Sequence, residues 1–269
     1  MNSMRRFVAP DLDLSGNAVQ IEGALFRHIA RVLRLKIGTP LVLADGSGGE
    51  CRGTIREIGR SSLLVGIEER VIPATSADEV WVTLFQGLPK GDKMELILQK
   101  CTELGVSEVI PFQSARSVSR VTGERMEEKV SRWRRIAVEA ARQAGRRTIP
   151  EVRFAATLAE ALRTADQELK LLLWEAEETV TLKKVLSAAA TPARIAIIVG
   201  PEGGISPDEA AVAISAGFTP VTLGKRILRT ETAGVAAMAI LQYEFGDLGN
   251  AREESEMAKP ARPAAEKKP

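Results

Sequence analysis

The stretch that decides the fold is residues 195–241, IAIIVGPEGGISPDEAAVAISAGFTPVTLGKRILRTETAGVAAMAIL. Apolar, β-branched runs alternate here with loops and helical patterns, which predicts strand, loop, helix, strand, loop and helix in that order. The first loop is residues 200–204 (GPEGG), and the second is residues 223–232 (LGKRILRTET). Two loops that each follow the carboxyl end of a strand form a crevice in which α/β proteins bind ligands.

The glycines of the first loop allow backbone groups to approach a ligand, because no Cβ stands in the way. The common phosphate-binding patterns do not fit. Residues 217–225 have six residues between the glycines and Arg226 after the lysine, which departs from the Walker pattern, and the run from Gly46 to Cys51 lacks the third glycine of a dinucleotide fingerprint. From the residues alone, the GPEGG loop is either a ligand-binding loop or a structural turn.

The composition indicates a globular protein that is long enough for one large or two ordinary domains. The chain has 269 residues, of which 45% are apolar and 27% charged. No apolar run approaches the roughly 20 residues of a membrane span, and no signal peptide is visible. Two cysteines without CxxC spacing predict a reduced, cytoplasmic protein, while the single histidine, His28, argues against a metal site and against a Ser-His-Asp hydrolase.

Positive charge is concentrated in the middle of the chain. Residues 114–150 hold ten Lys/Arg and four Asp/Glu, an excess of +6, whereas residues 151–269 hold 14 basic and 17 acidic residues, a balance of −3. Such a basic segment predicts a polyanion partner, and the alternative is a solvated helix face.

Two domains are expected from the pattern of elements. Residues 1–72 predict a small β-barrel, with strands at 5–8, 18–21, 40–43, 49–58 and 62–67 and one helix at 24–35. Residues 73–78 form the expected linker and residues 247–269 a polar, disordered tail. Residues 79–246 predict a mostly parallel α/β sheet, with strands at 80–86, 108–112, 170–175, 194–199 and 220–223 and helices at 93–104, 124–146, 158–164, 182–190, 207–216 and 231–243.

The chain resembles the SPOUT-class RNA methyltransferases, and within them the RsmE family. The resemblance rests on residues 195–241 and on four upstream segments, which are HIARVLR (28–34), GLPKGDKM (87–94), KCTELG (100–105) and EAARQ (139–143). It implies an N-terminal PUA-like RNA-binding barrel and a C-terminal domain with a deep trefoil knot, a rare topology. It also implies a homodimer, with contact through the Ala- and Gly-rich helix at 230–243. A core helix of the monomer is the alternative for that segment.

The activity that the resemblance implies is methylation of N3 of one uridine in the 16S RNA of the small ribosomal subunit, with S-adenosylmethionine (SAM) as cofactor. Two other functions stay open. One is a non-catalytic RNA- or ribosome-binding factor on the same fold, and the other is SAM-dependent methylation of another base or of a ribose. No metal and no membrane is expected as a partner.

The resemblance implies a SAM pocket built by both loops and by a preceding strand–loop element. Leu223, Ile227 and Leu228 are expected to wall an adenine pocket, and Thr230 is expected to cap the helix that follows it. The full set of candidate cofactor-binding residues is Trp174, Glu175, Gly200, Pro201, Glu202, Gly203, Leu223, Gly224, Ile227, Leu228, Arg229, Thr230, Glu231 and Thr232.

Methylation of uridine N3 requires loss of a proton or stabilisation of the uridylate. Arginine can donate hydrogen bonds to the charge that develops on O2 or O4, so Arg229 and Arg116 are the candidate catalytic residues. Glu202 and Glu231 are candidates for proton handling or cofactor contact, and a helix first-turn charge is the alternative for Glu231. Family members commonly have glutamate where Ala115 stands, so no acid–arginine pair is expected there.

The candidate RNA-binding residues are Arg5, Arg6, His28, Arg31, Arg34, Lys90, Lys93, Arg116 and Arg120. The alternative for Lys90 and Lys93 is a solvated helix face. For His28, an RNA-binding or packing role is set against a role in the chemistry.

Overall fold

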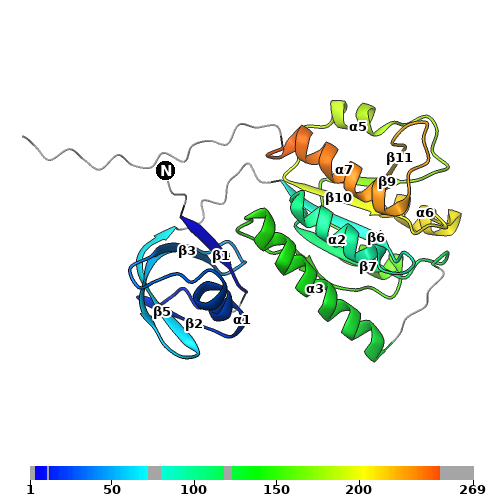
Figure 1. Cartoon of the computed structure of the whole chain (residues 1–269). Helices are drawn as coiled ribbons and strands as arrows, with labels where there is room; N and C mark the ends of the chain where they lie inside the picture. Colours follow the sequence, from blue (N-terminus) through cyan, green and yellow to red (C-terminus); the bar gives the residue numbers. More distant parts are fainter. Residues whose placement is uncertain (1–3, 11, 72–79, 118–122, 249–269) are drawn as a thin grey trace, which may run out of the picture.

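The structure of the chain, a computed structural model, describes residues 4–10, 12–71, 80–117 and 123–248. It contains two separate sheets, one N-terminal and one C-terminal (Figure 1). The expected linker at 73–78 and residues 249–269 of the expected tail lie outside the described residues. The domain boundaries that the sequence suggests therefore stay a prediction.

The N-terminal sheet has five strands in the order β1-β3-β4-β5-β2. Their bounds are β1 (Arg5–Val8), β2 (Ala18–Glu22), β3 (Pro40–Ala44), β4 (Glu50–Ile58) and β5 (Ser62–Val71). Alternate residues of β2 are buried, as a sheet with one face on a core requires. Among the described residues β1 and β2 are the edge strands, and the predicted small β-barrel is present as a half-barrel sheet.

The helix expected at 24–35 is wrong in its geometry. The structure has a short α1 (Gly23–Phe26) that continues as a π-helix (Arg27–Val32). Residues further apart than the usual four are bonded here: the Leu33 N–H donates to His28 O at 2.9 Å and the Leu35 N–H to Ile29 O at 3.1 Å. Val32, in this wider turn, is 68% exposed.

The C-terminal sheet has six strands, all parallel, in the order β11-β9-β10-β6-β7-β8. The expected parallel α/β sheet is therefore confirmed. The strands are β6 (Trp81–Gly87), β7 (Glu108–Phe112), β8 (Glu151–Val152), β9 (Leu169–Leu173), β10 (Arg194–Val199) and β11 (Thr219–Val221). Only the two-residue β8 was not predicted, because two residues carry no periodic signal.

Helices cover both faces of the C-terminal sheet (Figure 1). One face packs against α2 (Lys93–Glu103), α3 (Glu124–Ala144), α5 (Leu182–Ala188) and α7 (Thr230–Phe245). The other face packs against α4 (Leu158–Ala161), its 3-10 extension (Leu162–Thr164) and α6 (Pro207–Ser215). Helix α6 begins with a capping box, in which the Ser206 and Glu209 side chains each accept a hydrogen bond from the other's backbone N–H.

The expected trefoil knot stays a prediction. No helix in the described parts of the chain is long and apolar enough to cross a membrane.

Candidate functional site

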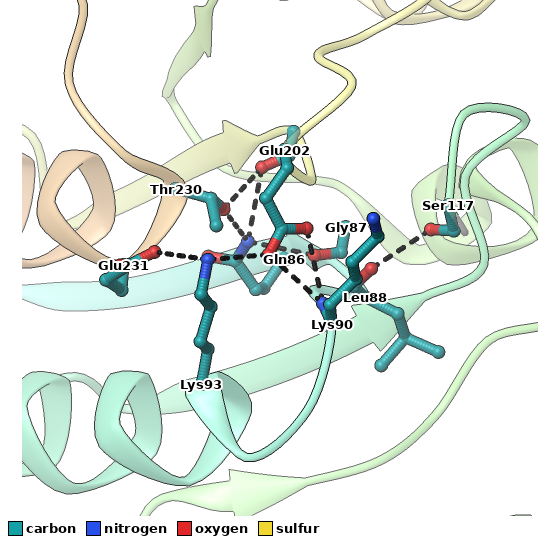
Figure 2. Close-up of polar contacts among 10 residues, drawn as sticks. Gln86, Gly87, Leu88, Lys90, Lys93, Ser117, Glu202, Thr230 and Glu231 are labelled. Atoms are coloured by element: carbon teal, nitrogen blue, oxygen red, sulfur yellow. Dashed lines mark hydrogen bonds and ion pairs between the residues drawn. The ribbon is translucent and has the colours of Figure 1, made fainter. Parts of the chain in front are cut away.

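The two loops meet at the carboxyl ends of β6 and β10 (Figure 2). The Thr230 hydroxyl donates to the Gly200 carbonyl at 2.6 Å, and it accepts a hydrogen bond from Gln86 Nε2 at 2.9 Å. Gln86 Nε2 also bonds Gly87 O at 3.0 Å. Uncharged hydrogen bonds thus join the GPEGG loop, the end of β6 and the start of α7 into one unit.

Thr230 is not the helix cap that the sequence predicted. Helix α7 begins at Thr230 itself, and Arg229 occupies the N-cap position without a side-chain cap bond. The buried Thr230 hydroxyl instead connects two loops that are 30 residues apart in the chain. Gln86 was missed by the sequence analysis. It follows an apolar strand at the edge where ligands bind, which is the signal that could have identified it.

Close backbone packing explains two of the glycines. A Cβ on Gly200 would lie 2.9 Å from the Gly204 carbonyl carbon, and a Cβ on Gly87 would lie 2.5 Å from Pro201 Cδ. Real Cβ atoms essentially never come this close to other atoms. A side chain at Gly200 would therefore distort the GPEGG loop itself, and one at Gly87 would push the end of β6 away from Pro201 after β10. Gly224, in the second loop, differs: its φ is +114° and a Cβ there would meet nothing within 4 Å.

A charged cluster surrounds Glu202, at the centre of the first loop (Figure 2). Lys93 Nζ is 2.8 Å from Glu202 Oε1 and 3.5 Å from Glu231 Oε2. The Lys90 backbone N–H donates to both Glu202 oxygens at 3.2 Å. Lys93 therefore contacts two carboxylates rather than open solvent, while the Lys90 side chain is exposed.

The cluster favours the charged forms of Lys93 and Glu202. The hydrogen bond to Glu202 raises the pKa of Lys93, and the Glu202 and Glu231 charges add to this. Burial alone would raise the pKa of Glu202, but the hydrogen bonds from Lys93 and from backbone N–H groups outweigh it, so the pKa of Glu202 is lowered. Glu202 is consequently a carboxylate, and an acceptor, at neutral pH.

Arg116 lies at the rim of the first loop. Its Nη1 donates to Gly203 O at 3.1 Å and is 3.7 Å from Glu175 Oε1. The residues before it are held by Glu209, which accepts hydrogen bonds from Ser114 Oγ and from the Ala115 N–H at 3.0 Å each. Glu209 thus has two roles: it closes the capping box of α6 and holds the loop that presents Arg116.

Arg229 lies beside the joined loops and is exposed. No side-chain hydrogen bond or ion pair of Arg229 is found among the described residues. Leu223 and Leu228 are half-buried, whereas Ile227 is 95% exposed in the single chain. The predicted place of Ile227 in a pocket wall stays a prediction.

The remaining predicted cofactor residues lie around the same loops. Trp174 Nε1 donates to Ile205 O at 3.3 Å, next to the GPEGG loop. The Thr232 N–H donates to Arg229 O at 2.9 Å in the first turn of α7. No group of three or more His, Cys, Asp or Glu side chains in the described ranges is arranged to hold a metal ion.

The RNA candidates of the N-terminal sheet are not gathered with these loops. Arg5 and Arg34 are exposed, and Arg31 donates to Arg60 O at 3.1 Å. The His28 ring lies edge-on to Phe7 at 6.2 Å. The Arg6 Nε pairs with Glu50 Oε2 at 3.2 Å. Arg120 lies outside the described residues.

Two family models match the chain. One, described as an RNA methyltransferase domain, matches residues 76–242, which is more than half of the chain. The other, described as an RNA methyltransferase PUA domain, matches residues 21–68. The two matched segments correspond to the C-terminal and N-terminal sheets.

Characterised relatives and solved structures agree with the family models. The Ribosomal RNA small subunit methyltransferase E of Mycobacterium bovis is 34% identical over 86% of this chain and 88% of that protein. The protein of the same name from Bacillus subtilis is 30% identical over 88% of this chain and 91% of its own. The Neisseria gonorrhoeae enzyme of that name, solved with S-adenosyl methionine, has a TM-score of 0.77 at 34% identity and covers 91% of this chain and 99% of its own. A Legionella pneumophila protein, Lpg2936, solved with bound SAM has a TM-score of 0.76 at 32% identity and covers 89% of this chain and 97% of its own.

Proposed function

The chain belongs to the RsmE family of SAM-dependent ribosomal RNA methyltransferases, and from that premise we propose that it methylates N3 of one uridine in 16S RNA. The observation that carries the proposal is the joining of the GPEGG and LRTET loops through Thr230. This join gives one edge of the sheet a preformed, glycine-lined site with an exposed arginine beside it.

The residues present fit the cofactor. SAM combines a carboxylate with ammonium and sulfonium cations, and the two loops together with the residues beside them offer both kinds of partner. Arg116 supplies a guanidinium, Glu175 and Glu202 supply carboxylates, and the open backbone at Gly224 leaves room for a ligand. We assign SAM binding to these residues and to the other predicted residues of the two loops. When bound, SAM supplies a methyl group whose leaving group is a neutral thioether.

The protein's own side chains have separate tasks in this proposal. Arg229, exposed and unpaired within the described residues, donates hydrogen bonds to the O2 or O4 charge of the uridylate. Arg116 is less free, because it already holds Gly203 O. Glu202, kept ionised by Lys93, accepts from a cationic group of the ligand. Alignment of the base against the methyl donor lowers the barrier without any metal.

We extend the proposal to the assembled small subunit as substrate and to a homodimer as the working form. Helix α7 has an apolar stripe at helical spacing, made by Ala236, Ile240 and Tyr243. Ile240 is 41% and Tyr243 71% exposed in the single chain, which supports a partner on this face. A ribosomal substrate also implies a cytoplasmic location.

The test incubates the protein with SAM and small subunits that lack the modification, followed by mass spectrometry of the 16S nucleosides. We expect 3-methyluridine at one position, and much less of it on protein-free 16S RNA. A methyl group on another base or on ribose would move the proposal to that target. Absence of SAM binding by calorimetry would favour a non-catalytic RNA-binding factor instead.

A further inference from the structure

The N-terminal half of the chain lies beside one end of α3 (Figure 1), and contacts there form a seam between the two halves. On one side is the turn at residues 45–49, between β3 and β4. On the other is the segment 145–149, between α3 and β8. The Ile149 N–H donates to Gly46 O at 2.9 Å, and Thr148 forms bridges with Gly46 and Ser47. Because 145–149 precede β8, the seam lies at the amino ends of the parallel strands, opposite the cofactor loops.

A buried carboxylate is the centre of this seam. Glu50, at the start of β4, has a side chain that is only 5% exposed. Its Oε2 is 3.2 Å from Arg6 Nε on its own sheet and 3.4 Å from Arg147 Nε on the other side of the seam. An acid so buried needs cationic partners, since an unpaired buried charge is strongly unfavourable. Glu50 therefore specifies which arginines meet there.

Two arginine side chains, Arg6 and Arg142, also donate across the seam to backbone carbonyls. Arg6 Nη1 donates to Gly145 O at 3.2 Å, and Arg142 Nε donates to Val8 O at 2.6 Å. Contacts thus run in both directions, from β1 to the segment after α3 and from α3 to β1. Bonds of planar guanidinium groups are directional, so they fix an orientation as well as a distance.

We infer that Glu50 is a positioning residue: with Arg6 and Arg147 it fixes the N-terminal sheet relative to the cofactor loops, so that both bind one RNA in a fixed spacing. The inference rests on the proposed function for its RNA substrate. Exposed Arg5 and Arg34 on one side and Arg229 on the other are separate contact points. Two linked contacts on one ligand strengthen each other only when their geometry matches the ligand.

The test replaces Glu50 by glutamine, which keeps the shape and removes the charge. We expect Glu50→Gln to raise the KM for small subunits about tenfold, because the second contact is no longer pre-positioned. The kcat and the Kd for SAM are expected to stay within about twofold, since the seam touches neither loop. The matched control is Glu57→Gln, an exposed acid on the same strand β4, which should change none of these values.

A crosslink separates positioning from general damage. Ser47 and Thr148 are antiparallel bridge partners, and such pairs have Cα atoms within disulfide range. Ser47→Cys and Thr148→Cys are added to Glu50→Gln. The disulfide between the two new cysteines should restore the wild-type KM when it is formed, and its reduction should raise the KM again. The native thiols should not interfere, because burial raises the pKa of Cys51 and raises that of Cys101 to about 12.

An unchanged KM in Glu50→Gln would overturn the inference, as would equal losses in kcat, KM and SAM affinity that the crosslink does not repair. Small-angle scattering tests the arrangement of the two sheets without substrate. A larger radius of gyration for Glu50→Gln than for Glu57→Gln supports the inference, and equal radii contradict it. Absence of 3-methyluridine with the wild type would count against the proposed function alone, because scattering still tests the seam. If Glu50→Gln does not fold, Arg147→Gln removes one partner at a half-exposed position and gives the same comparison.

Discussion

Arginines have opposite tasks at the two ends of the C-terminal sheet. At the carboxyl end, Thr230 and Gln86 join the loops by uncharged hydrogen bonds and Lys93 pairs with Glu202 and Glu231 beside them, while Arg229 is left exposed. At the amino end, Arg6 and Arg147 are paired with the buried Glu50. The difference is the acid: where a carboxylate is buried, nearby arginines become structural, and where neutral hydrogen bonds build the frame, an arginine stays available for a ligand.

The basic segment at 114–150 shows the same difference within one stretch. Nine of its ten Lys/Arg residues are described, and six of the nine contact backbone carbonyls or carboxylates: Arg116, Arg132, Arg134, Arg142, Arg146 and Arg147. Net charge counted from sequence therefore overstates the free positive surface, because it does not show which cations the fold already uses.

The largest effect is expected at Arg229. Replacement by alanine removes the exposed guanidinium that we assign to the uridylate, so turnover should fall about 100-fold or more. SAM affinity should change little, since no contact of the Arg229 side chain supports the loops. Single-turnover methylation of small subunits and calorimetry with SAM measure the two quantities.

Arg226→Ala is the matched control for Arg229→Ala, because Arg226 is an exposed arginine of the same loop. It should retain turnover near that of the wild type. Equal losses in the two variants would mean that the loop attracts RNA through charge in general. Unchanged turnover in Arg229→Ala would remove this arginine from the mechanism.

A second prediction addresses the uncharged frame. Thr230→Val keeps the side-chain shape but leaves Gly200 O and Gln86 Nε2 without their shared hydroxyl, which should lower the free energy of unfolding by about 1–3 kcal/mol. The affinity for SAM should fall as well, because both loops then move independently. Chemical denaturation and calorimetry measure these changes. Thr232→Val, at an exposed position two residues on, should leave both unchanged, and similar losses there would contradict the special role of Thr230.

A third prediction concerns the charged cluster at Glu202. Lys93→Met removes the hydrogen bond that lowers the pKa of Glu202, so that pKa rises and Glu202 becomes protonated at a higher pH than in the wild type. SAM affinity should therefore decline at a higher pH as the solution is acidified. Lys90→Ala keeps the backbone N–H on Glu202 and should retain the wild-type pH profile. A profile in Lys93→Met that matches the wild type would show that Glu202 does not bind the cofactor as a carboxylate.

The fold was largely predictable because its signals are local. The apolar runs of the parallel strands and the capping residues before α6 lie within short windows of sequence. The π-helix at Arg27–Val32 was not predictable, since its sequence fits ordinary helical spacing and the wider turn depends on packing against the N-terminal sheet. The two-residue β8 was missed because pairing with β7, rather than its own pattern, defines it.

The site was predictable where function and local chemistry coincide. The glycine-rich loops can be recognised in the sequence, but the hydrogen-bond partner of each side chain cannot. Thr230 has the residue type of a cap, yet its hydroxyl bonds Gly200 O, and Lys93 has the charge of a phosphate contact, yet it holds Glu202 and Glu231. These pairings connect segments more than 25 residues apart, and only tertiary structure determines them.

The smallest effect is expected at Arg132, on the exposed side of α3. Its Nη2 is 2.8 Å from Glu95 on α2, but the arginine side chain is 58% exposed. Such surface pairs contribute about 0–1 kcal/mol, so Arg132→Ala should shift the free energy of unfolding by no more than that and leave SAM affinity unchanged. The informative quantity is the KM for small subunits. An unchanged KM would mean that a cation paired with a carboxylate does not bind RNA even at the surface. The paired arginines of the seam suggest this outcome. A clear rise in KM would show that an arginine in such an exposed ion pair can still exchange its carboxylate partner for an RNA phosphate. Whether an arginine is structural or binds a ligand would then depend on the burial of the acid, and not on the pairing itself.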